Sequence, residues 1–170
     1  SFKLLTFQGQ EELDYRAIVQ DKSKIRNLIF VGFAKCLFDK QKFDSCTEKD
    51  LSEILENSHT VMKWFKMNDD QAKNLFNITY LDEEAQLHHY YPDFVVETTT
   101  DKYIIETKAS NQMTDKTVMA KKKEAVKWCE IATKFELDHN GKAWHYLLIP
   151  DNTVKLDRTF EKLAHDYEVK

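Results

Sequence analysis

The stretch YPDFVVETTTDKYIIETK, residues 91–108, contains two runs of aromatic and β-branched residues joined by a polar segment. Residues of these types favour β-strands, so the sequence predicts a hairpin with its turn at residues 99 and 100. In that register Asp93 lies directly across from Glu106. Because side chains alternate between the two faces of a strand, Lys108 projects on the same face as Glu106. The stretch therefore predicts two carboxylates and one ammonium on one face of a sheet.

Two acidic side chains in opposed positions need a compensating charge. Their Cβ atoms would lie roughly 5 Å apart, where like charges destabilise a sheet. Magnesium binds carboxylate oxygens together with water and phosphate oxygens, and a neighbouring ammonium can stabilise charge on a phosphoryl group. The pattern thus indicates phosphodiester hydrolysis. The alternative is that Asp93, Glu106 and Lys108 are ordinary residues of an exposed hairpin, although the apolar residues around them favour strands buried on both faces.

The rest of the chain predicts a mixed α/β domain. Ser45 and Glu48 form a helix-capping pattern, and Asp115 can cap a long helix. The elements we expect, in chain order, are helices at residues 23–38 and 47–57, strands at 76–81, 87–97 and 102–108, a helix from 114 or 115 to 135, a turn at 138–141, a strand at 144–149 and a helix at 158–167. The three consecutive strands predict an antiparallel meander, and a further strand completes a central mixed sheet flanked by helices.

The composition indicates one globular domain. Hydrophobic residues make up 42% and aromatic residues 12% of the 170 residues, which is enough for a core. The longest apolar runs fall far short of the roughly 20 residues that cross a bilayer. Three cysteines are too few for a disulfide framework, so we expect a cytoplasmic protein without a membrane partner. The net charge of −4 does not indicate a general polyanion binder, but residues 116–134 are rich in lysine.

The spacing of the acidic residues and the lysine resembles that of a known nuclease superfamily. Pro92-Asp93, followed after twelve residues by Glu106-Thr107-Lys108, resembles the PD-(D/E)xK nuclease superfamily. A wider set of segments looks like the C-terminal nuclease region of type III restriction enzyme Res subunits, namely Phe43-Asp44-Ser45 with Glu48, residues 90–94 and 105–108, Trp128-Cys129 and Trp144-His145-Tyr146. This resemblance covers about residues 24–150.

The resemblance implies a restriction-endonuclease-like fold and a role for each matching residue. Asp93 and Glu106 would bind Mg²⁺, for which Mn²⁺ would substitute, and the backbone carbonyl of Thr107 would add a ligand. Lys108 would orient or activate the attacking water. Glu48 would be a further acid at the metal or only a helix-capping residue, and the two roles are compatible. The implied substrate is duplex DNA.

The sequence also departs from the best-known relatives. It lacks the Gln-x-x-x-Tyr element of RecB-like nucleases, and it contains no Gly-x-x-x-x-Gly-Lys-Ser/Thr phosphate loop, so this chain has no ATP site. Because Res subunits are helicase-nucleases, we expect residues 1–170 to be a single endonuclease domain excised from a larger chain; the alternative is a stand-alone relative of these subunits. That chain would carry a helicase domain and act with a modification methyltransferase subunit. Within the domain we expect an N-terminal extension at 1–20, a core at 24–150 and a C-terminal helix at 157–168.

The sequence leaves other functions open. A repair or recombination nuclease would share this pattern, and so would a catalytically inactive DNA-binding or assembly module of the same fold. Four lysines of the basic segment could contact DNA phosphates or form a solvated helix face, namely Lys121, Lys122, Lys123 and Lys127. We expect no catalytic or metal-binding role for the histidines His88, His89, His139, His145 and His165.

Overall fold

The computed structural model describes residues 10–67 and 76–170. A five-stranded mixed sheet forms its centre, in the spatial order β10 (Glu168–Val169), β9 (Trp144–Pro150), β8 (Lys102–Lys108), β7 (Phe94–Thr98) and β4 (Val61–Lys66). Strand β7 is antiparallel to both β4 and β8, whereas β8 is parallel to β9. The prediction of a mixed α/β domain is confirmed.

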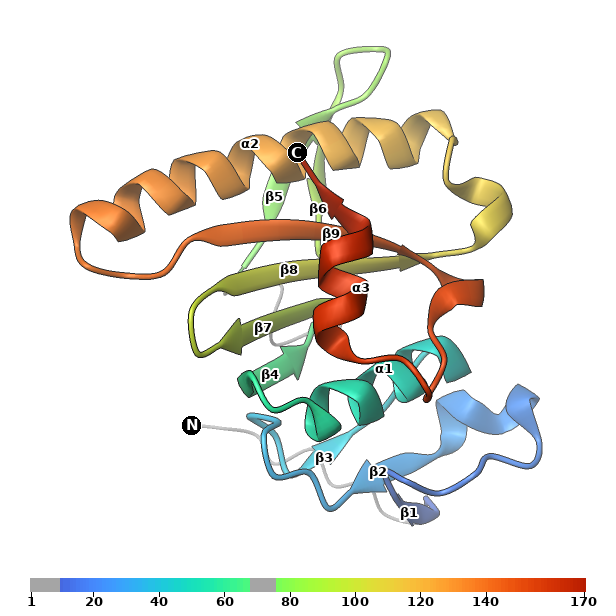
Figure 1. Ribbon diagram of the computed structural model, residues 1–170. Coiled ribbons are helices and arrows are strands. Elements are labelled where there is room, and N and C mark those ends of the chain that lie inside the picture. The colour runs from blue at the N-terminus through green and yellow to red at the C-terminus, as the bar shows by residue number, and fades with distance from the viewer. Residues whose placement is uncertain (1–9, 68–75) are drawn as a thin grey trace, which may run out of the picture.

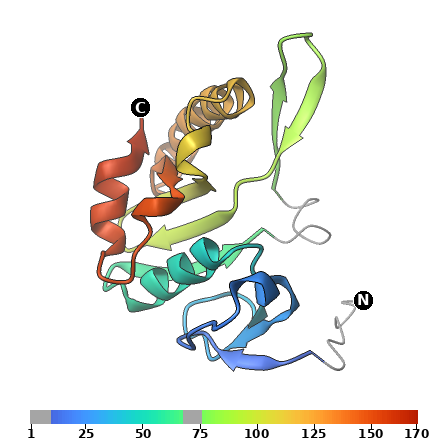
Figure 2. The ribbon, with the colours of Figure 1, turned by 90° about the vertical axis from the view of Figure 1, so that its right-hand side faces the viewer.

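Three α-helices cover the two faces of this sheet, α1 (Cys46–Asn57), α2 (Lys116–Asp138) and α3 (Phe160–Tyr167). Helices α1 and α3 lie on one side and α2 on the other (Figures 1 and 2). Parallel neighbouring strands need a crossover connection, and α2 supplies it between β8 and β9. The predicted helices at 47–57, 115–135 and 158–167 are confirmed, with ends that differ by up to three residues.

Apolar side chains fill both spaces between the sheet and its helices. One cluster lies under α1 and α3 and includes Trp64, Phe94 and Ile105. The other lies under α2 and includes Val95 and Ile104. Neighbouring residues of β7 and of β8 therefore pack into opposite clusters, as expected for strands that are buried on both faces.

The predicted meander is divided between two sheets. Its first strand is present and is antiparallel to the start of the second, as expected, but this pair lies outside the central sheet. Residues 76–81 do not join the central sheet, because β5 (Ile78–Leu81) pairs with β6 (Leu87–Tyr90) as a separate hairpin that rises past α2 (Figure 1). The strand beside β7 is β4, which the sequence did not reveal because a bulge between Val61 and Lys63 interrupts its alternation. The predicted strand 87–97 is divided near Pro92, which has no N–H to donate to a ladder.

The helix predicted at residues 23–38 is also wrong. A short 3₁₀-helix, η1 (Lys22–Asn27), leads into β2 (Ile29–Val31), which pairs with β1 (Glu12–Asp14) and β3 (Lys40–Gln41). Of the apolar residues at three-to-four spacing, Ile25 lies in η1 and Ile29 begins β2, in which the consecutive side chains of Ile29 and Phe30 are both fully buried. Of the extension predicted at 1–20, residues 1–9 lie outside the described residues, and 12–14 form a strand of this small sheet.

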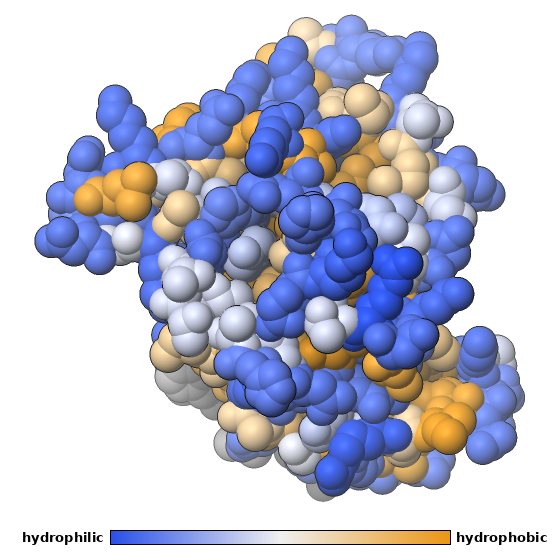
Figure 3. Space-filling view, viewed as in Figure 1, coloured by the Kyte–Doolittle hydropathy of each residue, from blue (hydrophilic) through white to orange (hydrophobic). Residues whose placement is uncertain are grey.

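The face of the molecule that Figure 3 shows is largely polar. In Figure 3, hydrophilic side chains separate the apolar ones into several small patches. In the described part of the chain, none of the helices has both the length and the apolar character that a membrane crossing demands.

Candidate active site

The hairpin of β7 and β8 has the predicted register. Phe94 lies opposite Ile105, and continuing this ladder by one residue places Asp93 opposite Glu106. Ile104, two residues before Glu106, packs in the α2 cluster, whereas Ile105 packs in the other cluster. Alternation therefore directs the Glu106 side chain toward the α2 face of the sheet.

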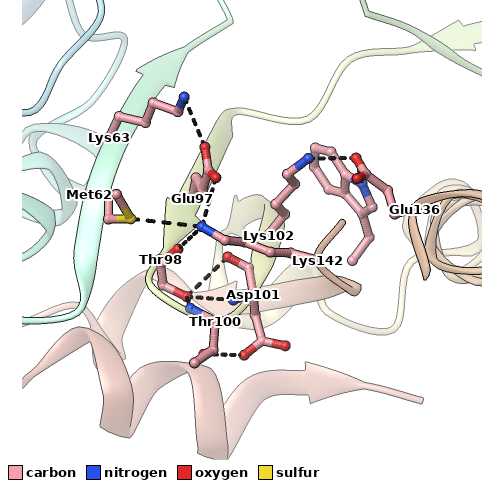
Figure 4. Close-up of polar contacts among 10 residues, drawn as sticks. Met62, Lys63, Glu97, Thr98, Thr100, Asp101, Lys102, Glu136 and Lys142 are labelled. Atoms are coloured by element: carbon pink, nitrogen blue, oxygen red, sulfur yellow. Dashed lines mark hydrogen bonds and ion pairs between the residues drawn. The ribbon is translucent and has the colours of Figure 1, made fainter. Parts of the chain in front are cut away.

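Polar contacts fix the turn end of this hairpin (Figure 4). The Lys142 ammonium donates to Glu97 Oε1 at 2.8 Å and to the carbonyl oxygen of Thr98 at 2.7 Å. The N–H of Thr98 donates to the carbonyl oxygen of Asp101 at 2.8 Å. A shift of the strands by one residue would break these contacts and turn every core side chain to the wrong face, so the register that positions the acids is strongly specified.

Asp93 immediately precedes the first residue of β7, so it lies just outside the ladder. Its Oδ2 accepts hydrogen bonds from the N–H of Thr107 at 2.8 Å and from the Thr107 hydroxyl at 3.0 Å. Its carbonyl oxygen accepts from the N–H of Met67 at 2.9 Å. The N–H and C=O of one strand residue point to the same side, so the carbonyl of Thr107 also points toward Asp93.

Glu106 is buried on the α2 face, with 9% of its surface exposed. The hydroxyl of Tyr90, from the end of β6, donates to Glu106 Oε2 at 3.2 Å. The Lys121 ammonium, from the first half of α2, lies 5.5 Å from the centre of the Tyr90 ring, which is a cation–π distance. A tyrosine and a lysine from two other elements thus lie beside this carboxylate. The sequence indicated Lys121 only as a possible DNA contact and gave no sign of Tyr90.

The two carboxylates disfavour each other's ionised form. Burial raises the pKa of Glu106, and the charge of Asp93 raises it further, whereas Lys121 and Lys108 lower it. Burial also raises the pKa of Asp93, against the hydrogen bonds from Thr107 and the charges of Lys66 and Lys108. The net direction is upward for both acids. An additional cation between them would relieve this repulsion.

Lys108 ends β8 on the same face as Glu106, as predicted. Its charge acts on both Asp93 and Glu106, and its side chain is partly exposed. Over residues 10–67 and 76–170, its ammonium forms no hydrogen bond or ion pair with the protein. It is therefore available to a polar ligand beside the acids.

Glu48 caps α1 and also binds a lysine. Ser45 Oγ accepts from the N–H of Glu48 at 3.1 Å, which confirms the capping prediction. In turn, Glu48 Oε2 accepts from the N–H of Asp44, whereas a standard capping box would use the N–H of Ser45. The same Oε2 lies 3.5 Å from the ammonium of Lys66. Burial raises the pKa of Glu48 to about 7, Lys66 opposes this, and Asp93 adds to it.

Lys66, like Tyr90, is a residue of this region that the sequence did not indicate. Only 4% of it is exposed, and its ammonium donates to Asp44 Oδ2 at 2.8 Å. Burial works to lower the pKa of Lys66, but Glu48, Asp44 and Asp93 outweigh it and the pKa is raised. The lysine therefore stays charged among three acids. The sequence did not indicate that Lys66 is buried, because it did not predict the strand that Lys66 ends, β4.

The four lysines of α2 predicted to contact DNA have different surroundings. Lys121 is partly buried and faces Tyr90 and Glu106, as described above. Lys122 is partly exposed and Lys123 fully exposed. Lys127 pairs with Glu124 at 2.7 Å. The structure thus brings one of the four to the acids and leaves the others along the helix.

Two of the histidines, His88 and His145, contact carboxylates other than Asp93 and Glu106. Nε2 of His88 is 2.7 Å from Asp82 Oδ2 within the β5–β6 hairpin. His145 lies between Asp101 and Glu168, with distances of 2.8 Å from Nε2 and 2.7 Å from Nδ1 to their carboxylate oxygens. These contacts join β8, β9 and β10 near the turn end of the hairpin.

The acidic pair is a donor set suited to magnesium. Among the described residues, no three Asp, Glu, His or Cys side chains come together as a metal-binding group. Magnesium, however, is often held by only one or two carboxylates, with water and substrate phosphate oxygens as its other ligands. Asp93, Glu106 and the carbonyl of Thr107 provide such a partial set, and their repulsion favours a cation. The residues present therefore fit the metal that the sequence predicts.

Comparisons with known proteins give no family assignment. No family model matches the chain, and a search of curated proteins finds no significant relative.

Proposed function

We propose that this chain is a magnesium-dependent endonuclease domain that hydrolyses phosphodiester bonds in duplex DNA. The observation that carries the proposal is the opposed pair Asp93 and Glu106, two acids with raised pKa values and with the charges of Lys108 and Lys121 beside them. Perturbed acids next to cations are typical of catalytic sites. The order α1, β4, β7, β8, α2, β9 supports the proposal, since it is the order of a restriction-endonuclease-like core.

In this proposal each residue of the pair and its neighbours has a distinct role. Asp93, Glu106 and the carbonyl of Thr107 hold Mg²⁺, which when bound supplies positive charge to the scissile phosphate and lowers the pKa of a nearby water. The hydrogen bonds from Thr107 and Tyr90 orient the two carboxylates. Lys108, with no partner among the described residues, donates to the attacking water or to a phosphate oxygen.

The basic side chains of α2 would then approach the DNA backbone beside the site. Lys121 would contact a phosphate next to the scissile one, because it lies beside Glu106. Lys122 and Lys123 would contribute salt-sensitive contacts without sequence preference. Lys127 would contribute less, since Glu124 already neutralises it.

The proposed biological setting follows from the sequence resemblance. The domain would be the cleavage module of a type III restriction Res subunit in the cytoplasm, with a helicase domain in the same full-length chain and a methyltransferase subunit as partner. A helicase encoded upstream in the same gene and a methyltransferase gene beside it would support this setting. Their absence would favour a repair or recombination nuclease with the same chemistry.

Nicking of supercoiled plasmid DNA with Mg²⁺ or Mn²⁺ tests the proposed activity. We expect Lys108→Ala to lower the rate by at least about 10²-fold, as for the loss of one charge-stabilising donor, with the fold retained. Lys102→Ala is the matched control, because Lys102 lies on the same strand and face but at the turn end, where it pairs with Glu136 at 2.5 Å. Equal rates for Lys108→Ala and the control would contradict the assigned role, and a parent that neither binds metal nor cuts would be an inactive module.

A further inference from the structure

Lys66 and Glu48 form a buried ion pair next to the proposed metal ligands. The ammonium of Lys66 lies 2.8 Å from Asp44 Oδ2 and 3.5 Å from Glu48 Oε2, and the side chains of Lys66 and Glu48 are 5% and 7% exposed. Its charge also acts on Asp93. The Lys66 ammonium therefore already provides a positive charge to Asp44, Glu48 and Asp93.

This ion pair and Glu106 occupy different faces of the sheet. Lys66 lies opposite Phe94 in the ladder of β4 and β7, and Phe94 packs in the cluster under α1 and α3. Glu106 shares the other face with Ile104, under α2. Directly opposed residues of antiparallel strands project to the same side, so Lys66 projects toward α1 and not toward Glu106. Asp93, the residue before β7, has charge interactions with Glu48 on one side and with Glu106 on the other.

A centre with two metal ions would need carboxylate oxygens that already contact the Lys66 ammonium. Such centres hold ions about 3.5–4 Å apart with carboxylates serving both. Here a second ion on the Glu48 side of Asp93 would have to displace an ammonium that is almost inaccessible to solvent. Glu48 Oε2 is further engaged by the N–H of Asp44 at 2.7 Å. Glu48 also does not join Asp93 and Glu106 in a three-ligand group among the described residues.

We propose that Lys66 takes the place of a second divalent ion, so that the site binds a single ion between Asp93 and Glu106. This inference rests on the proposed function. Glu48 is then a positioning residue: it holds the Lys66 ammonium, which in turn stabilises the charge of Asp93, and it does not bind the metal itself. The sequence left Glu48 open as a ligand or a cap, and the structure assigns it to the cap and to Lys66.

Titration of the metal-free protein with Mn²⁺, by calorimetry and by electron paramagnetic resonance without DNA, tests the inference. We expect one Mn²⁺ per chain, with the spectrum of an isolated ion. Removal of a ligand in Glu106→Gln should lower the Mn²⁺ affinity by more than about tenfold, the smallest effect typical of groups that only support a ligand. Glu48→Gln should lower it by less than that. Two ions per chain, a spin-coupled Mn²⁺ pair, or an equal loss of affinity in the two variants would overturn the proposal.

A third variant tests the lysine directly. In Lys66→Met the acids around position 66 lose their cation, and the unbranched side chain is only one heavy atom shorter, so we expect a second Mn²⁺ to bind. A folded Lys66→Met protein that still binds one ion would contradict the role of Lys66. If this variant does not fold, the parent and Glu48→Gln still decide the stoichiometry. A parent that binds no Mn²⁺ would instead defeat the proposed function, so the two failures are distinguishable.

Discussion

The hydroxyl of Tyr90 donates a hydrogen bond to Glu106 Oε2 at 3.2 Å, across the junction between the β5–β6 hairpin and the central sheet. The outer hairpin thus contributes a side chain to the acidic pair. Tyr90 is also the residue over which Lys121 lies, so it connects α2, the hairpin and β8. Through this contact the β5–β6 hairpin positions a hydroxyl at Glu106, although its strands belong to a separate sheet.

We predict that Tyr90→Phe shifts the pH profile of cleavage. The Tyr90 hydroxyl helps to lower the pKa of Glu106, so its removal raises that pKa further. The acid limb of the rate profile, where Glu106 must lose its proton to bind metal, should therefore move to higher pH. Where Glu106 is ionised, stability should fall by about 1.5–3 kcal/mol, as for one hydrogen bond to a charged group. Tyr103→Phe is the control, because Tyr103 lies on the same strand as Glu106 but at the turn end of the hairpin. An unchanged limb in Tyr90→Phe would refute the role of the contact.

We predict that Lys121 and Lys123 contribute to different quantities. Lys121→Ala removes a charge that lowers the pKa of Glu106, so it should slow cleavage and move the acid limb to higher pH. Lys123→Ala, two residues away and exposed, should only weaken DNA binding and reduce the slope of log affinity against log salt by about 1. Rates measured against pH and binding measured against salt separate the two effects. Identical behaviour of the two variants would contradict the distinction.

We predict that His145 stabilises the fold more at pH 6 than at pH 8. Burial lowers the pKa of His145, but its bonds to Asp101 and Glu168 outweigh this, and the pKa lies above the ordinary value of 6.5. Protonated His145 can donate to both carboxylates, whereas the neutral ring has one donor. Its contribution is therefore complete below the unfolded-state pKa and is lost as the pH rises through the folded-state pKa. The unfolding free energies of the parent and His145→Gln should differ more at pH 6 than at pH 8, and a constant difference would contradict this account.

The sequence predicted the acidic pair because its geometry depends on local features. A turn at residues 99 and 100 and a side-chain period of two suffice to place Asp93 across from Glu106, and the observed register agrees. Capping at Ser45 and Asp115 is equally local, since each side chain bonds an N–H two or three residues ahead. These predictions needed no knowledge of the tertiary structure.

The sequence failed where long-range packing decides the structure. Strand β4 contains a bulge and two lysines, so only its pairing with β7 identifies it as a core strand. Lys66 becomes a buried partner of Glu48 through that pairing. Ile29 follows Ile25 at a helical spacing, yet residues 29–31 form a strand that pairs with β1 and β3. Tyr90 and Lys121 reach Glu106 from elements whose relative placement no local pattern specifies.

We predict that removing one acid stabilises the metal-free protein. The folded-state pKa of Glu106 is raised by burial and by Asp93, so its ionised form opposes folding, and stability without metal should fall as the pH rises from the unfolded-state to the folded-state pKa. Glu106→Gln removes this penalty. In a chelator at pH 8 its melting temperature should exceed that of the parent by about 2–4 °C for each ~1 kcal/mol of relieved repulsion.

The exposed Glu130→Gln on α2 is the control and should leave the melting temperature unchanged. Addition of Mn²⁺ should reverse the order, because only the parent retains both carboxylate ligands and gains stability from the bound ion. A Glu106→Gln protein that melts below the parent in chelator would show that the two carboxylates do not repel each other, and the argument for a cation between them would lose its basis.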